Sequence, residues 1–274
     1  MRPVSEFPPR AERRGRPLSL SAVLPAYNEQ AVISETLRRT HAALAATGIP
    51  RFEVIVVDDG SADATRERCD EVAAQLPEVR VVSHARNRGY GGALRSGFES
   101  AGGDALFVMD SDGQFDPADI ELLLPEWDGA TVVCGRRVKR VDPLIRRLNH
   151  DAFFGVVNLL FGRTARDINC GFKLFPRAAG QGLTTDGAVI CTELLVRARA
   201  GGLRIVDVPV PHHPRLTGKP TGARIGVIAH AFRELWRLRR EVRRAGPSAP
   251  ASLDGDEVVE APRGTPQAGA TKTR

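Results

Sequence analysis

The sequence predicts an α/β fold, in which a mostly parallel central sheet is covered by helices on both faces. Three observations support this prediction. The chain has 274 residues, 42% of them hydrophobic, which suits one large core. Between residues 18 and 135, short β-branched runs alternate with longer stretches of helical periodicity. Gly, Pro, Asp or Asn punctuates these segments, so each run indicates a short strand that is buried on both faces.

The first half of the chain contains the clearest elements. Its apolar runs have the length of strands, and the segments between them have the length of helices. The expected strands are Leu18–Leu24, Glu53–Val57, Val79–Ser83, Ala105–Met109 and Thr131–Cys134, and the expected helices cover 30–47, 62–75, 90–101 and 117–126.

The periodicity weakens after residue 136, so the second half is harder to divide. We expect helices over 143–161 and 192–200, with short strands near 172–175 and 204–210.

A basic amphipathic helix is predicted over residues 223–244, because apolar residues recur there at helical spacing and arginines occupy the rest of the surface. We therefore expect a disordered basic N-terminus (1–17), one folded domain (18–222), this helix, and a disordered tail (245–274) rich in Pro, Gly and small residues. The apolar face of the helix comprises Ile225, Ile228, Phe232, Leu235 and Val242.

The net charge of +6 is concentrated near the ends of the chain. Residues 1–17 carry +3 and residues 224–244 carry +5, whereas the tail from residue 245 and the body between residues 18 and 223 each carry about −1. A near-neutral body argues against a nucleic-acid groove. The basic flanks fit either a loose attraction to an anionic surface or a solvated face without function.

The cysteines and the N-terminus favour a soluble, cytoplasmic protein. Cys69, Cys134, Cys170 and Cys191 lie far apart without metal-site spacing, so we predict reduced core thiols. The N-terminal stretch has no apolar signal segment, and the longest apolar stretch, 153–161, is too short to span a bilayer.

Acidic residues follow three of the predicted strands, at the edge where an open parallel sheet binds its ligands. Asp110 and Asp112 form an Asp-x-Asp motif after the fourth strand. Two carboxylates at this spacing suit Mg²⁺ or Mn²⁺ that also holds a diphosphate. The alternative is an acidic loop that caps the helix beginning near Pro117.

The loops after the first two strands favour a nucleotide pocket. Tyr27 has the chemistry to stack on a base, and Glu29 and Asp59 have the chemistry to accept hydrogen bonds from a base or ribose. Taken singly, each residue has a structural alternative: Asp58 or Asp59 as a helix cap, Glu29 as a partner of the helix dipole, and Tyr27 as a core aromatic.

Four segments together resemble one known family. They are LPAYNE, VVDDGSAD, NRGYGGALRSG and DSDGQFDP, in that order along the chain. The set resembles the nucleotide-sugar-binding half of family-2 glycosyltransferases, which implies the GT-A fold. The glycine-rich segment and Gln114 resemble more narrowly the branch that transfers mannose or glucose to dolichyl or polyprenyl phosphate. The resemblance covers about residues 18–222.

The resemblance also implies roles for individual residues. Residues of the first two loops would bind the nucleoside, the Asp-x-Asp motif and its Gln would hold metal and sugar phosphate, an Arg after the fifth strand would face the phosphates, and a basic loop would close as a lid. The implied donor-binding residues are Pro25, Tyr27, Glu29, Asp58, Asp59, Arg137, Arg215 and Lys219; the implied metal ligands are Asp110 and Asp112, with Gln114 beside them.

The glycines of the third segment invite a second interpretation, as a dinucleotide-binding fingerprint. The spacing does not fit, because residue 94 is Leu where the fingerprint needs Gly. We expect Gly89, Gly91 and Gly92 to let the following helix start close to the sheet.

Two further segments of the second half match the branch. Residues 167–173 resemble its Asp-x-x-x-Gly-Phe-Arg/Lys segment, and residues 211–219 resemble its Arg-x-x-Gly-Lys/Ser loop. In the proposed lid, Arg215 and Lys219 would face the leaving diphosphate. The alternative is a solvated basic turn. His212 and His213 receive no role.

A general base is needed only if the acceptor is a hydroxyl, since a phosphate is already largely anionic. Glu193 is the best candidate for a base, and its alternative is a carboxylate that stabilises the first turn of its helix. The Gln-x-x-Arg-Trp motif of processive synthases is absent from the sequence, which disfavours a chain-building enzyme.

The sequence therefore predicts an inverting transferase that moves a hexose from a GDP- or UDP-sugar to a polyprenyl phosphate, with peripheral contact at the inner face of the membrane through the apolar stretch near residue 153 and the basic helix. Nucleic acid is not an expected partner. Two alternatives stay open: a transferase with a soluble hydroxyl acceptor, and a non-catalytic nucleotide-sugar-binding protein.

Overall fold

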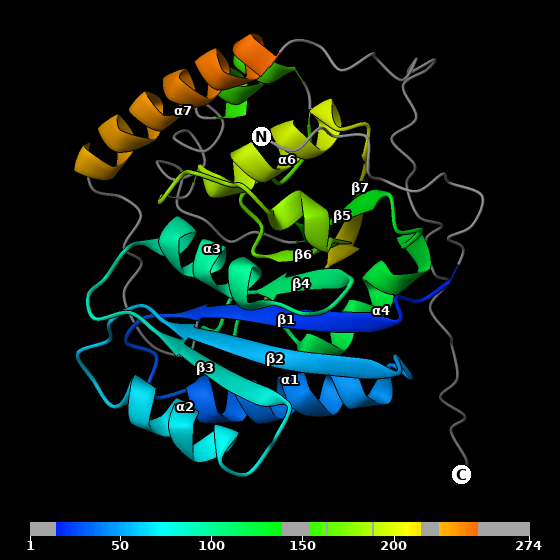
Figure 1. Cartoon of the computed structure of the whole chain (residues 1–274), viewed down its shortest axis with the longest axis vertical. Coiled ribbons are helices and arrows are strands. Elements are labelled where there is room, and N and C mark those ends of the chain that lie inside the picture. The colour runs from blue at the N-terminus through cyan, green and yellow to red at the C-terminus, as the bar shows by residue number, and fades with distance from the viewer. Residues whose placement is uncertain (1–14, 139–153, 163, 188, 215–224, 246–274) are drawn as a thin grey trace, which may run out of the picture.

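The computed structural model describes residues 15–138, 154–162, 164–187, 189–214 and 225–245. These residues form a seven-stranded sheet in the order β3-β2-β1-β4-β6-β5-β7 (Figure 1). Each predicted strand is present, with ends that differ by a few residues at most. The strands are β1 (Ser19–Ala26), β2 (Arg51–Asp58), β3 (Val79–Ser83), β4 (Ala105–Met109), β5 (Thr131–Arg137), β6 (Phe172–Pro176) and β7 (Arg204–Val210).

The direction of β6 distinguishes the two halves of the sheet. The strands β1 to β4 pair in parallel, and β7 pairs in parallel with β5. In contrast, β6 runs antiparallel to both β4 and β5. Because it starts beside the end of β4, with Phe172 opposite Met109, β6 places the residues just before it at the carboxyl edge of the sheet. The prediction of a mostly parallel sheet is confirmed.

Helices cover both faces of the sheet, as predicted (Figure 1). On one face lie α1 (Ile33–Ala46) and α2 (Thr65–Ala73), which share one buried cluster with residues of β1, β2 and β4. On the other face lie α3 (Tyr90–Ser100) and α6 (Ile190–Ala200), which share a second cluster. Alternate residues of a strand point to opposite faces, so one strand serves both clusters: Leu24 belongs to the first and Val23 to the second.

Short helical turns complete the first half. The predicted helix at 117–126 is divided into α4 (Ile120–Leu123) and two flanking 3₁₀ turns, η2 (Pro117–Asp119) and η3 (Leu124–Glu126). Asp116 caps this stretch, since its side chain accepts a hydrogen bond from Ala118 N. A further turn, η4 (Arg177–Gly180), follows β6.

The predicted basic helix is present as α7 (Ile225–Ala245), which lies over α6 on its side away from the sheet (Figure 1). Leu235 and Leu238 of α7 are buried, and Glu241 pairs with Arg197 of α6 at 3.1 Å. Within the described ranges, no helix has the length and apolarity to cross a membrane.

Some predictions fall on residues that the structure does not describe. Residues 154–161 are helical, and the rest of the predicted helix at 143–161 lies outside the described residues, as do most of the N-terminus and the tail after residue 245. The predicted lid residues Arg215 and Lys219 also lie outside them.

Candidate active site

Hydrogen bonds join the loop after β1 to the loop after β2. Asn28 N donates to Ser61 Oγ at 3.0 Å, Asn28 Oδ1 accepts from Ala62 N at 2.9 Å, and Glu29 N donates to Thr65 Oγ1 at 2.8 Å. Asn28 has a φ of 56°, in the left-handed region that Asn tolerates better than most residues. The two loops therefore form one unit, and this unit leaves Tyr27 42% exposed at its edge.

The two acids at the end of β2, Asp58 and Asp59, accept hydrogen bonds from backbone groups. Asp58 Oδ1 accepts from Ser61 N at 3.2 Å and closes a local turn in the loop before α2. This contact is not the helix cap given as its alternative, because α2 begins only at Thr65 and its N-cap residue forms no side-chain cap. Asp59, only 3% exposed, accepts from Arg88 N at 2.8 Å and Gly89 N at 2.9 Å, and its Oδ1 lies 2.6 Å from His84 Nδ1. Asp59 thus fixes the loop that leads into α3. Its contact with a nucleoside stays a prediction.

Asp110 and Asp112 follow the end of β4, at the carboxyl edge of the sheet. Asp112 is buried, and its Oδ1 accepts from Gln114 N at 3.1 Å. Tyr90 Oη donates to Asp110 Oδ1 at 2.9 Å. Burial raises the pKa of Asp110 to about 6, and the neighbouring charge of Asp112 adds to this rise. The pair is therefore a place where a bound cation would relieve electrostatic repulsion.

Gly171 makes room for the Asp110 carboxylate. The Asp110 N–H donates to the Gly171 carbonyl at 3.0 Å, and a Cβ atom on residue 171 would overlap the carboxylate of Asp110. The glycine of the segment at 167–173 is thus required by the packing of β6 against β4, a role that the sequence alone did not indicate.

Gln114 ties the loop after β7 to the Asp-x-Asp loop. Its side-chain Nε2 donates to the His213 carbonyl at 3.0 Å, and its own carbonyl accepts from His213 N at 2.8 Å. The ring of His212 packs edge-on against Phe115 at a centroid distance of 5.0 Å. The segment predicted to carry the lid therefore leaves β7 beside Gln114, two residues after Asp112, although no role was expected for these histidines.

Arg137 is paired with an acid of the segment that precedes β6. Its Nε and Nη2 atoms donate to the two carboxylate oxygens of Asp167, each at 2.8 Å, and both side chains are largely buried. This bidentate geometry holds Arg137 close to the Asp-x-Asp edge. Contact between Arg137 and phosphates stays a prediction.

The contacts of Glu193 do not support the role of catalytic base. This buried carboxylate accepts from the backbone N–H groups of Thr184 and Thr185, at 2.9 to 3.0 Å, and from both threonine hydroxyls. Arg197 Nε adds a 2.8 Å ion pair. A carboxylate has about four lone-pair sites, and these donors fill them. Glu193 lies in the first turn of α6, as its alternative role has it, and it also holds the 184–185 backbone.

The glycines after β3 have a different partner from the expected one. Gly91 lies against the backbone around Asp186, and Gly92 lies against the side chain of Arg88, rather than against the sheet. The N–H groups of both glycines donate to the Asp186 carbonyl, at 2.8 and 3.2 Å. The glycine that lets α3 approach the sheet is Gly97, where a Cβ would overlap Val23. The expectation for Gly89, Gly91 and Gly92 was therefore wrong, because it considered only the nearest strand.

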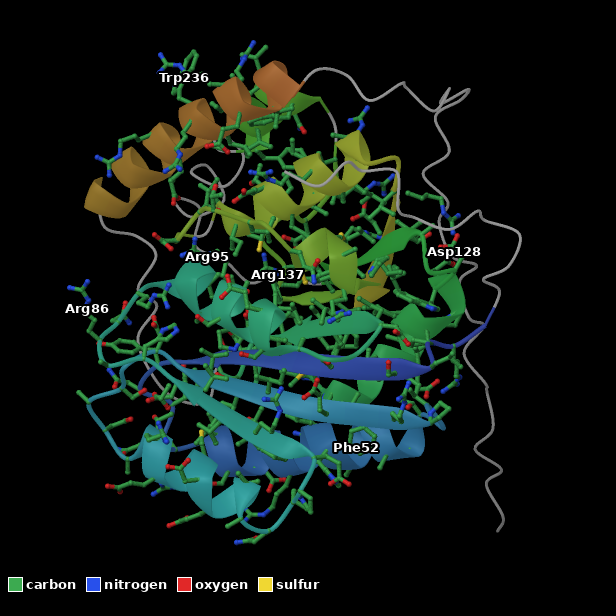
Figure 2. The ribbon with its side chains drawn as sticks, viewed as in Figure 1. Phe52, Arg86, Arg95, Asp128, Arg137 and Trp236 are labelled. Atoms are coloured by element: carbon green, nitrogen blue, oxygen red, sulfur yellow. The ribbon has the colours of Figure 1, made fainter. Side chains whose placement is uncertain are left out.

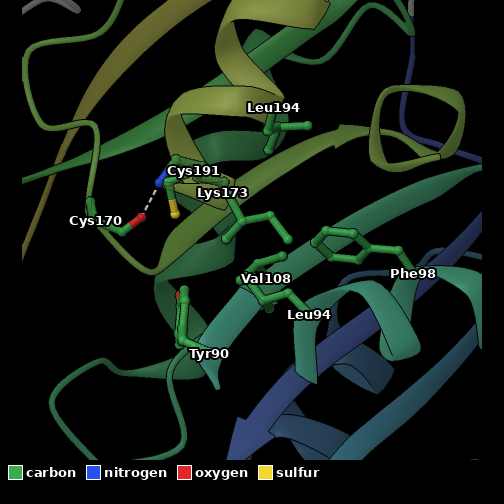
Figure 3. Close-up of a pocket in the computed structure, with 9 residues that line it drawn as sticks. Tyr90, Leu94, Phe98, Val108, Cys170, Lys173, Cys191 and Leu194 are labelled. Carbon is green, nitrogen blue, oxygen red and sulfur yellow. Dashed lines mark hydrogen bonds between the residues drawn. The ribbon is translucent and has the colours of Figure 1, made fainter. Parts of the chain in front are cut away.

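A small apolar pocket lies beside Tyr90, between α3, the sheet and α6 (Figure 3). Lys173, only 2% exposed, lines it and donates to the Cys170 carbonyl. Burial raises the pKa of the Cys170 thiol to about 12, so the thiol stays protonated at neutral pH. This pocket is part of the packing beneath the acid pair, and its lining does not suit a nucleotide.

The residues at the acid edge fit a divalent cation shared with a ligand. In the part of the chain that the structure describes, no group of three or more His, Cys, Asp or Glu side chains is arranged to hold a metal ion. Mg²⁺ is commonly held by one or two carboxylates together with substrate phosphates and water. Asp110 and Asp112 match that smaller donor set.

A family model now identifies this architecture. The model described as Glycosyl transferase family 2 matches residues 21–184, a span that contains the loops after β1 and β2, the acid pair and Gly171. The chain belongs to family 2 of the glycosyltransferases. The family prediction is confirmed, and the matched span makes the acid edge the active-site candidate of a glycosyltransferase.

Three relatives illustrate the family. Glycosyltransferase AglD of Haloferax volcanii is 35% identical over 86% of this chain and 40% of its own length. An undecaprenyl-phosphate 4-deoxy-4-formamido-L-arabinose transferase of Edwardsiella ictaluri is 33% identical over 73% of this chain and 62% of its own. A dolichyl-phosphate beta-glucosyltransferase of Saccharomyces cerevisiae is 30% identical over 71% and 66%. The chain thus spans less than two thirds of each relative.

Solved structures show the same fold. A glucosyl-3-phosphoglycerate synthase of Mycobacterium tuberculosis, in complex with Mn²⁺, UDP-glucose and phosphoglyceric acid, aligns with a TM-score of 0.58 at 22% identity, over 89% of this chain and 83% of that chain. A mannosyl-3-phosphoglycerate synthase of Rubrobacter xylanophilus aligns with a TM-score of 0.60 at 16% identity, over 87% and 78%. The GT-A fold of this glycosyltransferase is confirmed.

Proposed function

We propose that this family-2 glycosyltransferase is an inverting enzyme that moves a hexose, mannose or glucose, from a GDP- or UDP-sugar to a polyprenyl phosphate. The observation that carries the proposal is the Asp110–Asp112 pair at the ligand-binding edge of the sheet, where burial and then the charge of Asp112 raise the pKa of Asp110. The names of two relatives, which act on undecaprenyl and dolichyl phosphates, support the acceptor class.

The donor nucleoside would bind where the loops after β1 and β2 join. Pro25 lies at the end of β1, where its carbonyl accepts from Ser111 Oγ at 2.7 Å, so the first loop is tied to the acid pair as well. Tyr27 offers an exposed ring, and Glu29 and Asp59 would accept from ribose or base. A nucleoside diphosphate bound there would extend toward Asp112.

Asp110, Asp112 and Gln114 would hold Mg²⁺ or Mn²⁺ together with the donor diphosphate. The cation would supply neutralisation of the charge that develops on the departing diphosphate. Tyr90 orients the Asp110 carboxylate for this task, and Gln114 keeps the loop after β7 beside it. We propose three basic side chains as further phosphate contacts: Arg137, Arg215 and Lys219.

The acceptor would need no general base. A phosphate monoester is already largely anionic near neutral pH, so its oxygen attacks the sugar carbon without losing a proton. A single direct displacement inverts the configuration of that carbon. The fully engaged carboxylate of Glu193 fits this acceptor better than a hydroxyl, for which a base with a free lone pair is required.

The outer face of α7 suits peripheral contact with an anionic membrane, where a polyprenyl phosphate resides. Arg233, Trp236, Arg237 and Arg240 are exposed and recur at helical spacing. Trp236, 57% exposed, points away from the molecule (Figure 2), and Arg239 lies over its ring at 5.9 Å. A tryptophan among arginines is typical of interfacial helices.

The deciding experiment measures hexose transfer from GDP- and UDP-sugars to a polyprenyl phosphate with Mn²⁺ or with chelator. We expect turnover that requires metal and is lost in Asp112→Ala. Asp116→Ala is the matched control, because Asp116 caps the neighbouring helical turn and pairs with Arg39 outside the acid edge. Donor binding without turnover on a broad acceptor panel would instead support a non-catalytic binding protein.

A further inference from the structure

Residues 184–187, Thr-Thr-Asp-Gly, form a segment before α6 that three helices hold in place; we call it the TTDG segment. From α6, Glu193 binds Thr184 and Thr185 as described above. From α3, Arg95 donates to the Thr184 carbonyl at 3.1 Å and pairs with Asp186. The segment has no regular structure of its own, so its position depends on these neighbours.

The third helix is α7, through the side chain of Glu234. This side chain is only 9% exposed, and its Oε1 accepts from Asp186 N at 3.0 Å and from Gly187 N at 3.4 Å. A buried carboxylate requires such donors because it has lost its water. The contact joins α7, which begins at residue 225, to a segment that lies against the N-terminal end of α3.

The TTDG segment and the first turn of α3 are packed too closely to move independently. The Gly91 N–H donates to the Asp186 carbonyl at 2.8 Å. A Cβ on Gly91 would lie 2.7 Å from the carbonyl oxygens of Thr185 and Gly187, and a Cβ on Gly89 would lie 2.9 Å from that of Asp186. Any displacement of the segment would therefore shift the first turn of α3.

That first turn carries the side chain that orients the acid pair. Tyr90 is the first residue of α3, and its hydroxyl binds Asp110 Oδ1 at 2.9 Å. The contacts thus run without a gap from Glu234 on α7, through Asp186 and Gly91, to Tyr90 and Asp110. Closely packed, hydrogen-bonded groups of this kind carry positional coupling between distant elements.

We propose that Glu234 is a positioning residue for glycosyl transfer. It acts through the TTDG segment and Tyr90 to set the orientation of the Asp110 carboxylate. By this inference α7 helps to position the active-site acids, in addition to being a candidate membrane contact. The effect on turnover rests on the proposed function, whereas the effect on the first turn of α3 does not.

The test compares Glu234→Ala with a matched control on the same helix, Glu241→Ala. Glu241 binds Arg197 and Arg237, and among the described residues it has no hydrogen bond or ion pair with the TTDG segment. Its loss therefore loosens α7 without releasing Asp186. We expect Glu234→Ala to lower kcat by about 10- to 100-fold with little change in the donor KM, as misplaced catalytic groups do. Glu241→Ala should change kcat less than about threefold.

Two further variants separate positioning from general stabilisation. Glu234→Gln keeps an acceptor oxygen in place and should restore most of the activity. In a Tyr90→Phe background, Glu234→Ala should add little to the loss, because both changes remove the same orientation. Additive losses in this double-mutant cycle, or equal losses for Glu234→Ala and Glu241→Ala, would overturn the proposal.

Hydrogen exchange gives a readout that does not need activity. Amides of residues 88–94 should exchange faster in Glu234→Ala than in the wild type or Glu241→Ala, and unchanged exchange there would contradict the proposal. If the wild type transferred no sugar, this exchange result would still decide the inference, and the proposed function alone would fail. If Glu234→Ala did not fold, Glu234→Asp, which shortens the side chain, should show the same faster exchange.

Discussion

The Tyr90 hydroxyl donates a hydrogen bond to Asp110 Oδ1 at 2.9 Å, from the first residue of a helix to the first residue after a strand. Burial, and then the charge of Asp110, raise the pKa of Tyr90 well above its ordinary value, so the hydroxyl remains a donor throughout the physiological range. This hydrogen bond favours the ionised form of Asp110, which is the form that binds metal.

Tyr90→Phe should therefore weaken metal-dependent donor binding most strongly at low pH. Without the hydrogen bond, the pKa of Asp110 rises above its value of about 6. The Asp110 carboxyl is then protonated in a larger share of the molecules at pH 6 than at pH 8, and the protonated form does not bind metal. We expect the Kd for nucleotide with Mn²⁺ to increase about tenfold at pH 6 and by less at pH 8. Titration calorimetry at both pH values measures this, and an equal change at both would contradict the assigned role.

Asp110→Asn should stabilise the metal-free protein at neutral pH. Folding raises the pKa of Asp110 from about 3.9 in an unfolded chain to about 6, so the folded state binds the extra proton. The resulting stability is present below about pH 4 and is lost as the pH rises through 6. The Tm of Asp110→Asn should thus exceed that of the wild type at pH 8, with a smaller difference at pH 5.

Metal should reverse the order of the two Tm values, so that the wild type melts above Asp110→Asn. Mn²⁺ with nucleotide would raise the Tm of the wild type by binding only the folded state, and Asp110→Asn should gain much less. The same melts with chelator serve as the control. A wild-type Tm that Mn²⁺ and nucleotide leave unchanged at pH 8 would remove the support for a cation at this edge.

Gly171→Ala should abolish most activity, because the added methyl group would overlap the carboxylate of Asp110. The carboxylate would have to move, at a cost of about 1–3 kcal/mol in the free energy of unfolding. Gly155→Ala is the matched control. Gly155 is helical, and a Cβ added there would meet no atom within 4 Å, so this variant should gain up to about 1 kcal/mol in the free energy of unfolding. Urea unfolding and a transfer assay measure both effects.

Reversing charge on the outer face of α7 should reduce membrane binding. Arg237→Glu with Arg240→Glu should lower sedimentation with vesicles rich in phosphatidylserine by about tenfold or more, since each basic residue near such a surface contributes about 1 kcal/mol. Arg38→Glu with Arg68→Glu is the control, because these exposed residues lie on α1 and α2, on the opposite face of the sheet. Equal losses for both pairs would mean that only net charge matters.

The sequence alone was sufficient for the α/β class, the strands and the family, and the physical reason is local. Strand and helix patterns depend only on residues that are close together in the sequence. The apolar run at 105–109, which forms β4, is an example. Acids placed directly after strands also share one edge in any parallel sheet, so Asp58, Asp59, Asp110 and Asp112 could be grouped before the fold was known.

Contacts between distant segments could be found only in the tertiary structure. The run at 172–175 has the same apolar pattern in either direction, so only its pairing with β4 and β5 set β6 antiparallel. Glu193 had the sequence context of a base, and its donors at Thr184 and Thr185 became visible only when the loop folded back onto α6.

What the sequence by itself determined was therefore the list of chemical groups at the edge of the sheet and the family to which they belong. The tertiary structure decided which of those groups face one another: Tyr90 with Asp110, Arg137 with Asp167, and Glu234 with the TTDG segment. The reason is that hydrogen bonds and close packing depend on distance in space. Asp186 and Glu234 are 48 positions apart in the chain, and no local sequence pattern predicts their contact.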